Sequence, residues 1–180
     1  MRELVESPPY RRIALFGLVI SRHASVIARV LSYELTLEER VGDSVGIGIV
    51  YRPGDPVSAG NADDWVRAFQ DLAYVNVKGR PLVFDKVSSA QTDLYAAIDK
   101  GVDVLLVTDG LDAESSTIAR IARSRHILTA GSSPDYVQRD LTLCVAEESD
   151  KTTILINLRS AEAERIRFSS RLLALATFIR

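Results

Sequence analysis

Hydrophobic and polar positions follow two different periods along this chain. Four short runs rich in Val, Ile and Leu are typical of strands that are buried on both faces. These runs cover residues 45–51, 82–87, 102–108 and 127–130. Between them, apolar residues recur every three or four positions, which indicates helices that pack one face on a core. The order of the two patterns predicts alternating strands and helices.

The helices can be placed by their apolar stripes and capping residues. They are predicted at residues 26–37, after Asp63 or Asp64, at residues 91–100, after Asp112 or a neighbour, and after the serines that precede Pro134. The segment 52–64 is rich in Pro, Gly, Asn and Asp, so we expect a turn there. Alternation of this kind predicts the α/β class, with a single domain and a mostly parallel sheet flanked by helices.

The C-terminal third departs from this alternation. Residues 141–146 and 153–158 read as two strands whose connection is too short for a crossover helix, so we expect an antiparallel hairpin. The charged segment 159–167 is expected to be solvated. Ser169 or Ser170 can cap a closing helix, whose apolar stripe is formed by Leu172, Leu175, Ala176 and Ile179.

We expect an N-terminal segment of residues 1–25 ahead of an α/β domain of residues 26–180. An apolar run at residues 13–20 follows Arg11 and Arg12. Eight residues are too few to span a membrane, so no direct membrane insertion is expected. The run is either a packed element or the remnant of a signal peptide.

Composition narrows the function classes. The chain has 180 residues, a formal net charge of -2 and charges of both signs interspersed, so no basic surface for nucleic acid is indicated. Its one cysteine, Cys144, cannot form a disulfide within a single chain. Cys144 lies in an apolar run, where a small buried side chain is expected.

Motifs for catalysis or cofactors are incomplete. Asp109 follows a strand as a phosphoacceptor would, but no acidic pair follows residues 45–51 and no lysine follows residues 127–130. Gly46 and Gly48 lie inside a strand, whereas a dinucleotide fingerprint needs its glycines after the strand. The two histidines have no partner at metal-ligand spacing. We therefore expect no enzyme, no catalytic residue, no cofactor and no metal.

Two groups of residues remain as binding candidates. In parallel α/β sheets, ligands bind beyond the carboxyl ends of the strands, which makes Arg52, Asp109 and Ser132 a possible ligand or partner rim. Trp65, Phe69 and Phe178 are a possible interface, with burial in the core as the alternative. Both groups are hypotheses about contact with another molecule.

The closing segment resembles a known family. Asn157 at the end of an apolar strand, a charged stretch, and then the residues from Phe168 to Ala176 (FSSRLLALA) look like the YfiR-like family of bacterial proteins. The strand at 102–108 with Asp109 and Gly110 resembles the central strand of that family. The likeness covers roughly residues 26–180. It departs from the redox-responsive relatives, which carry several cysteines, so we expect a divergent member.

The resemblance implies a function as well as a fold. Members of the family are implied to be small, non-enzymatic periplasmic proteins, usually dimers, that bind and repress a membrane diguanylate cyclase. Cyclic-di-GMP signalling, and with it biofilm growth, would then be controlled from outside the inner membrane. The alternative is a small-ligand binding module of the periplasmic-binding half-domain type, with its pocket at the rim. The sequence identifies neither the partner nor the ligand.

Overall fold

The secondary structure follows the predicted alternation through most of the chain. In the computed structural model, residues 9–149 and 151–179 are described. The elements are α1 (Pro9–Leu31), α2 (Leu37–Arg40), β1 (Val45–Tyr51), α3 (Pro56–Gln70), β2 (Asn76–Val77), β3 (Arg80–Ser88), α4 (Gln91–Asp99), β4 (Val104–Val107), α5 (Ser115–Arg125), β5 (Leu128–Gly131), α6 (Pro134–Arg139), β6 (Leu143–Glu148), β7 (Lys151–Asn157), α7 (Leu158–Ala163), α8 (Ser170–Leu173) and β8 (Thr177–Ile179).

The strands form one sheet in the order β2-β3-β1-β4-β5-β6-β7-β8. The five central strands, β3 to β6 in this order, are parallel to their neighbours. At one margin β2 pairs antiparallel with only the first two residues of β3. At the other margin β6 and β7 form the predicted antiparallel hairpin, and β8 then pairs parallel with β7. The mostly parallel sheet of the predicted α/β fold is therefore confirmed.

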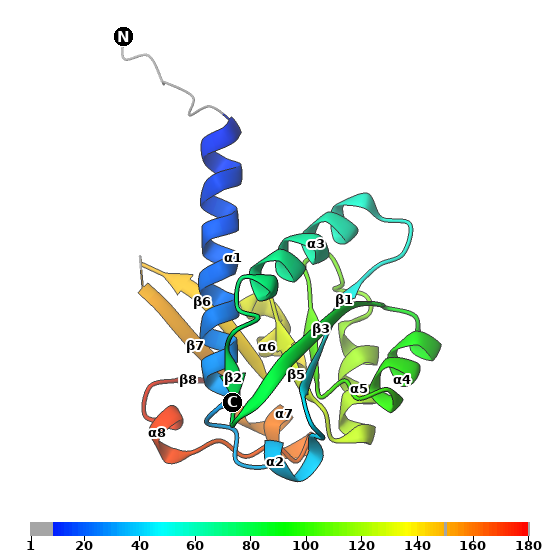
Figure 1. Cartoon of the computed structure of the whole chain (residues 1–180), viewed down its shortest axis with the longest axis vertical. Coiled ribbons are helices and arrows are strands. Elements are labelled where there is room, and N and C mark those ends of the chain that lie inside the picture. The colour runs from blue at the N-terminus through cyan, green and yellow to red at the C-terminus, as the bar shows by residue number, and fades with distance from the viewer. Residues whose placement is uncertain (1–8, 150, 180) are drawn as a thin grey trace.

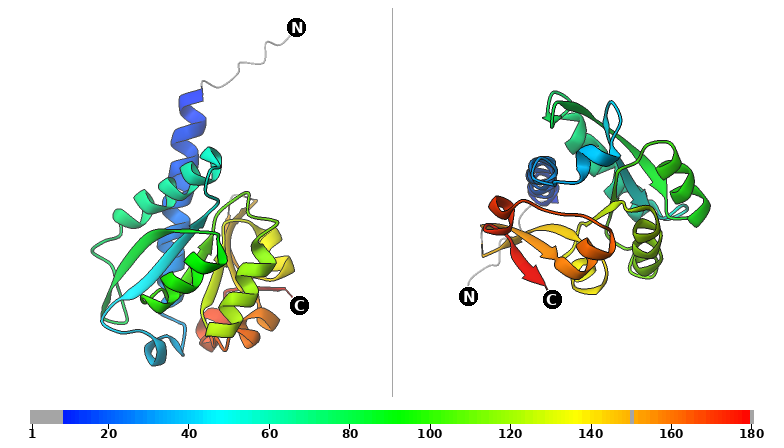
Figure 2. Two further views of the ribbon diagram at one scale, coloured as in Figure 1. Left: turned by 90° about the vertical axis from the view of Figure 1, so that its right-hand side faces the viewer. Right: turned by 90° about the horizontal axis from the view of Figure 1, so that it is seen from below.

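Helices cover both faces of the sheet, as Figures 1 and 2 show. One hydrophobic core lies between the sheet and helices α1 and α3, and includes Ile27, Phe69 and Ile47. A second core lies on the opposite face beneath α4, α5 and α6, and includes Leu94 and Ile118. The central strand β4 contributes alternate residues to both cores, which is why its sequence is continuously apolar.

Two helix boundaries differ from the sequence-based expectation. Helix α1 ends at Leu31, whereas the helix was predicted to continue to residue 37, and Leu35 in that stretch is exposed. Helix α3 starts eight residues before Asp64, since Asp55 accepts hydrogen bonds from the amides of Val57 and Ser58. Proline at the first helical position has a backbone already suited to a helix. Residues 56–64, which were predicted as part of a turn, therefore form the first half of α3.

The C-terminal segment also corrects two expectations. The closing helix is a single turn, α8, capped by Ser169 as predicted, and residues 177–179 form strand β8. Pairing with β7 satisfies the backbone of β8, and this tertiary contact outweighs the helical spacing of its apolar residues. The charged segment 159–167 is not fully solvated, because Ile166 and Glu164 are buried.

Helix α1 is one continuous helix that crosses residue 25, the expected boundary of the N-terminal segment. Its first residues include the apolar run 13–20, while residues 1–8 lie outside the described part of the chain. The N-terminal half of α1 stands clear of the other elements in Figure 1 and in the left view of Figure 2. Among the described residues, no helix combines the length and the apolar character needed to cross a bilayer.

Candidate functional site

The carboxyl ends of β1 and β4 meet where the chain changes from one face of the sheet to the other. The connection after β1 leads to α3, which packs in the first core, and the connection after β4 leads to α5, which packs in the second. Such a divergence leaves a crevice between the two connections, where doubly wound folds usually bind ligands. Arg52 directly follows β1 and so lies at the start of one of these connections.

Arg52 is held by groups of the same chain. Its Nε donates to Glu114 Oε1 at 2.8 Å, and its Nη2 donates to Glu114 Oε2 at 2.8 Å and to the carbonyl oxygen of Gly110 at 2.6 Å. The paired hydrogen bonds match the planar guanidinium to the carboxylate. They lower the pKa of Glu114 and raise the pKa of Arg52. The connections after β1 and β4 are thus bridged by an internal ion pair.

The other two rim residues contact each other. Ser132 Oγ donates to Asp109 Oδ1 at 2.5 Å, so the ends of β4 and β5 are joined. Beneath them the hydroxyl of Tyr136 donates to the carbonyl of Thr108 and accepts from the amide of Leu111. Burial raises the pKa of Tyr136, which keeps the hydroxyl protonated and able to donate. All three predicted rim residues therefore gather at one edge of the sheet, in contacts within the chain.

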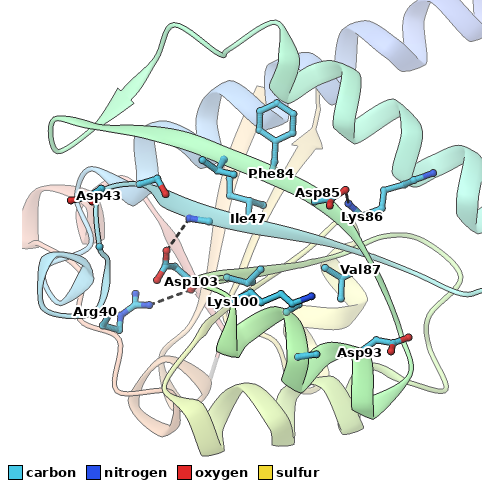
Figure 3. Close-up of a pocket in the computed structure, with 18 of the residues that line it drawn as sticks. Arg40, Asp43, Ile47, Phe84, Asp85, Lys86, Val87, Asp93, Lys100 and Asp103 are labelled. Carbon is cyan, nitrogen blue, oxygen red and sulfur yellow. Dashed lines mark hydrogen bonds between the residues drawn. The ribbon is translucent and has the colours of Figure 1, made fainter.

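A separate open cavity of about 750 Å3 extends along β3 and α4, from Gly42 and Asp43 at the amino edge of the sheet to Ser88 and Asp93 near the carboxyl end of β3. Figure 3 shows it between β3, the start of β1 and helix α4. Val83, Val87, Ala96, Ala97 and Val102 give it apolar walls. We call this space the amino-edge cavity. The sequence analysis did not predict it, because residues from a loop, two strands and a helix approach one another only after folding.

Arg40 and Asp103 form the inner wall of the amino-edge cavity. Arg40 Nη2 lies 2.6 Å from Oε2 of the buried Glu34, and its Nη1 donates to the carbonyl oxygen of Asp103 at 3.2 Å. Asp103 Oδ2 accepts from the amide of Gly46 at 2.8 Å. Burial raises the pKa of Asp103, although the Gly46 amide and Arg40 oppose the shift.

Further charges around this cavity have no counterion within the chain. Asp43, Asp85, Asp93 and Lys100 line it, and none of them forms an ion pair with another residue of the described part. Three of these four charges are negative. The amino-edge cavity therefore presents uncompensated acidic side chains beside apolar walls, and this arrangement suits a cationic group with an apolar stem.

The predicted interface residues divide into buried and exposed ones. Trp65 and Phe69 are 3% and 0% exposed, so they pack in the first core and present no surface to a partner. Their helix turns them toward the sheet, where Phe69 stacks with Phe84 at a ring distance of 5.9 Å. Phe178 differs, since it lies on the marginal strand β8 and is 39% exposed. Nearby Leu175 is 73% exposed.

Cys144 lies in the interior of the protein and not at its surface. Cys144 is buried in the second core, and burial raises the pKa of its thiol to about 12. A thiol with that pKa stays protonated at neutral pH and is a poor nucleophile. Within residues 9–149 and 151–179, no three His, Cys, Asp or Glu side chains come together as metal ligands.

Comparison with known proteins identifies a family. The sequence profile described as YfiR/HmsC-like matches residues 57–177, which is more than half of the chain. This range includes the strands of the sheet from β2 to the start of β8. The search among curated proteins returns no match.

Solved structures share the fold at low sequence identity. A conserved domain protein from Vibrio cholerae O1 biovar El Tor has a TM-score of 0.65 and 17% identity, over 89% of this chain and 60% of that one. The open, ligand-free substrate-binding protein CD0873 from Clostridium difficile gives 0.59 and 16%, over 81% and 57%. An ABC domain from Streptococcus pneumoniae in complex with L-Trp gives 0.53 and 13%, over 84% and 60%. The chain spans about three fifths of each, and the likeness establishes the fold alone.

Proposed function

The chain belongs to the YfiR/HmsC-like family, and on this premise we propose that it is a non-enzymatic regulator that binds and represses a membrane signalling protein. A diguanylate cyclase is the proposed partner, contacted from the periplasmic side of the membrane. The activity attributed to the family is regulatory and not catalytic, which supports this reading. The control of cyclic-di-GMP and of biofilm growth would follow from that repression.

The observation that carries the proposal is the open margin of the sheet at β8. This strand is the last in the sheet order, so its outer backbone groups have no strand partner in the described part of the chain. Phe178 lies on β8 and Leu175 lies just before it, and both side chains are exposed. An unpaired edge flanked by exposed apolar side chains is typical of a surface that another protein covers.

A homodimer is part of the same proposal. The N-terminal half of α1 stands away from the other elements, and Leu18 on it is 60% exposed. A helix that projects in this way is suited to pack against a second copy. Light scattering at several protein concentrations measures the mass of the particle directly, and a monomer at every concentration would contradict the dimer.

The test of the function combines partner recovery with signalling output. Membranes of the native host would be incubated with the tagged protein and with its Leu175→Asp/Phe178→Asp variant. We expect the protein to recover a membrane diguanylate cyclase and the variant to lose it, because a carboxylate in an apolar interface is costly to bury. Loss of the protein from the host should raise cyclic-di-GMP. No cyclase recovered and unchanged cyclic-di-GMP would refute the proposal.

A second candidate function is the binding of a small ligand. The amino-edge cavity favours it, because about 750 Å3 lies within the range of small-molecule sites. The rim of Arg52, Asp109 and Ser132 was the expected location, and it stays a candidate only if a ligand displaces the Arg52–Glu114 ion pair. A thermal-shift screen of metabolites tests both locations, since a ligand that binds the folded protein raises Tm.

A further inference from the structure

Strand β3 has a second open edge at the opposite margin of the sheet from β8. Its partner on the outer side, β2, pairs only with Arg80 and Pro81. From Leu82 to Ser88, β3 pairs with β1 on its inner side and has no strand on its outer side among the described residues. Seven residues of a strand span about 23 Å at 3.3 Å each. This stretch, residues 82–88, is called the β3 edge.

The backbone groups that point outward from the β3 edge can be identified. The amide of Lys86 donates to Oδ1 of Asp85 at 2.7 Å, a side-chain contact that takes the place of a strand partner. Backbone groups of a strand alternate between its two sides. The amides and carbonyls of Leu82, Phe84 and Lys86 therefore face outward, in phase with Arg80, which pairs with β2. The groups of Leu82 and Phe84 are open to an added strand, and the amide of Lys86 joins them once it exchanges Asp85 for a strand partner.

The amino-edge cavity lies beside this edge on one face of the sheet. Val83, Asp85 and Val87 point to the face that carries α4, since Val87 belongs to the second core and strand residues alternate between faces. Val83 is 53% exposed there and lines the cavity. Every second side chain of a strand added at the β3 edge would therefore point toward the cavity.

We propose that the β3 edge and the amino-edge cavity together bind an extended basic segment of a partner protein, which joins the sheet as an added strand. Backbone hydrogen bonds to Leu82, Phe84 and Lys86 hold the segment, and its alternate side chains enter the cavity. There one lysine or arginine of the segment lays its apolar stem on Val83 and places its charge near Asp85, and a second one, further along the added strand, lies near Asp93. This inference rests on the proposed function only in taking the partner to be a protein.

The charge of the site decides which partner fits. Asp43, Asp85 and Asp93 have no counterion in the described part of the chain, and they outnumber Lys100, the lining cation that also lacks a counterion there. Asp103, which is 6% exposed, uses only one carboxylate oxygen in a hydrogen bond within that part. A cationic side chain gives these groups the partner they lack. A second copy of this chain would instead bring two sets of aspartates together, and like charges on facing strands are destabilising.

The experiment uses the whole protein and three labelled nine-residue probes. The first alternates lysine and valine, the second alternates glutamate and valine, and the third keeps the lysines but replaces its two central valines with proline, which cannot donate backbone hydrogen bonds. Fluorescence anisotropy at low salt measures binding. We expect the first probe to bind most tightly and each of the others to bind at least about tenfold more weakly. Amide hydrogen exchange should slow at Leu82 and Phe84.

Protein variants assign the binding to this site. Asp85→Asn/Asp93→Asn removes two cavity charges, and Asp71→Asn/Asp135→Asn makes the same change of net charge at two exposed residues that do not line the cavity. We expect the first variant to weaken binding of the lysine–valine probe by about tenfold and the second to change it by less than about twofold.

Three results would overturn the inference. They are equal binding of the proline-containing probe, equal effects of the two double variants, and self-association of the protein that the probe blocks. The first would show attraction by charge without strand pairing, the second would show that the cavity is not the site, and the third would assign the edge to a second copy. None of them involves Leu175 or Phe178, so failure here leaves the test of the proposed function intact.

Discussion

The two ends of the sheet contrast in how their polar groups are satisfied. At the carboxyl edge, Arg52 is bonded to Glu114 and Ser132 to Asp109, so the groups predicted to meet a ligand meet one another. Along the amino-edge cavity, Asp43, Asp85 and Asp93 have no counterion in the described residues. The usual ligand position of α/β folds favours the carboxyl edge as a binding site, while aspartates without a counterion favour the amino-edge cavity. The contrast teaches that the usual ligand position of a fold can be filled by contacts within the chain, so that charges without a partner are found elsewhere in the molecule.

The largest expected effect concerns Gly46 and Gly101, two residues that line the amino-edge cavity and whose backbones are in close contact. A Cβ on Gly46 would stand 2.1 Å from the carbonyl oxygen of Gly101, so Gly46→Ala forces two backbone segments apart. We expect the free energy of unfolding to fall by more than about 3 kcal/mol in urea denaturation. Gly48→Ala is the control, because its Cβ meets the side chain of Val87 at 3.0 Å, and a side chain can yield. Equal losses of stability for the two variants would mean that the backbone at Gly101 moves away from residue 46 as easily as the side chain of Val87 moves away from residue 48.

The second prediction concerns the part of the amino edge that is closed. Glu164 is buried there and accepts hydrogen bonds from the amide and hydroxyl of Thr129 and from the hydroxyl of Thr142. Burial raises the pKa of Glu164 from 4.5 to about 7. The folded protein therefore holds this proton more tightly than the unfolded chain does. The resulting stabilisation is complete below pH 4.5 and is lost as the pH rises through about 7.

Glu164→Gln isolates this contribution, because the amide does not titrate. We expect the free energy of unfolding of the variant, relative to the natural protein, to increase between about pH 5 and pH 8. The increase should reach at most about 3 kcal/mol, since one pKa unit corresponds to about 1.4 kcal/mol. Denaturant titrations at several pH values measure it. A difference independent of pH would mean that Glu164 titrates alike in both states.

The third prediction addresses Asn157, which holds α7 over the same closed region. Its Oδ1 accepts from the amide of Ser160 at 3.0 Å, and its Nδ2 donates to the carbonyl of Val137 at 2.8 Å. Asn157→Ala removes a helix cap and leaves a buried carbonyl unpaired, so we expect a loss of about 2 kcal/mol in thermal or urea unfolding. Asn157→Asp keeps the cap but not the donor. An aspartate variant as stable as the natural protein would show that the Val137 contact contributes little.

Most strands and caps could be predicted because their signals are local. The run at Val45–Tyr51 is β-branched and buried, and Ser133 precedes a proline at the start of a helix, as found. The start of α3 was missed although Asp55 followed by Pro56 is a cap signal, because Gly60 and Asn61 weaken the helical pattern after it. Packing of α3 on the sheet outweighs that local weakness.

The candidate site could be predicted only in part, for a physical reason. The carboxyl edge follows from the rule that parallel strands end together, so the grouping of Arg52, Asp109 and Ser132 was foreseeable. The amino-edge cavity depends on how α4 crosses β3, and no local pattern carries that information. Glu164 was read as a solvated charge, since burial of a carboxylate depends on donors supplied by β5 and by Thr142.

The smallest expected effect bears on the carboxyl edge. Ser132→Ala removes the hydrogen bond to Asp109, an exposed contact, so we expect a change of less than about 0.5 kcal/mol in the free energy of unfolding. Ser116→Ala is the control, because Ser116 makes a similar exposed hydrogen bond to Asp140 at 2.6 Å. If the edge binds no ligand, a metabolite that raises Tm should do so equally in both variants. A rise in Tm that is lost only in Ser132→Ala would show that a ligand can displace the internal contacts of the carboxyl edge. Both ends of the sheet could then bind a ligand, and they would differ only in how tightly they bind it.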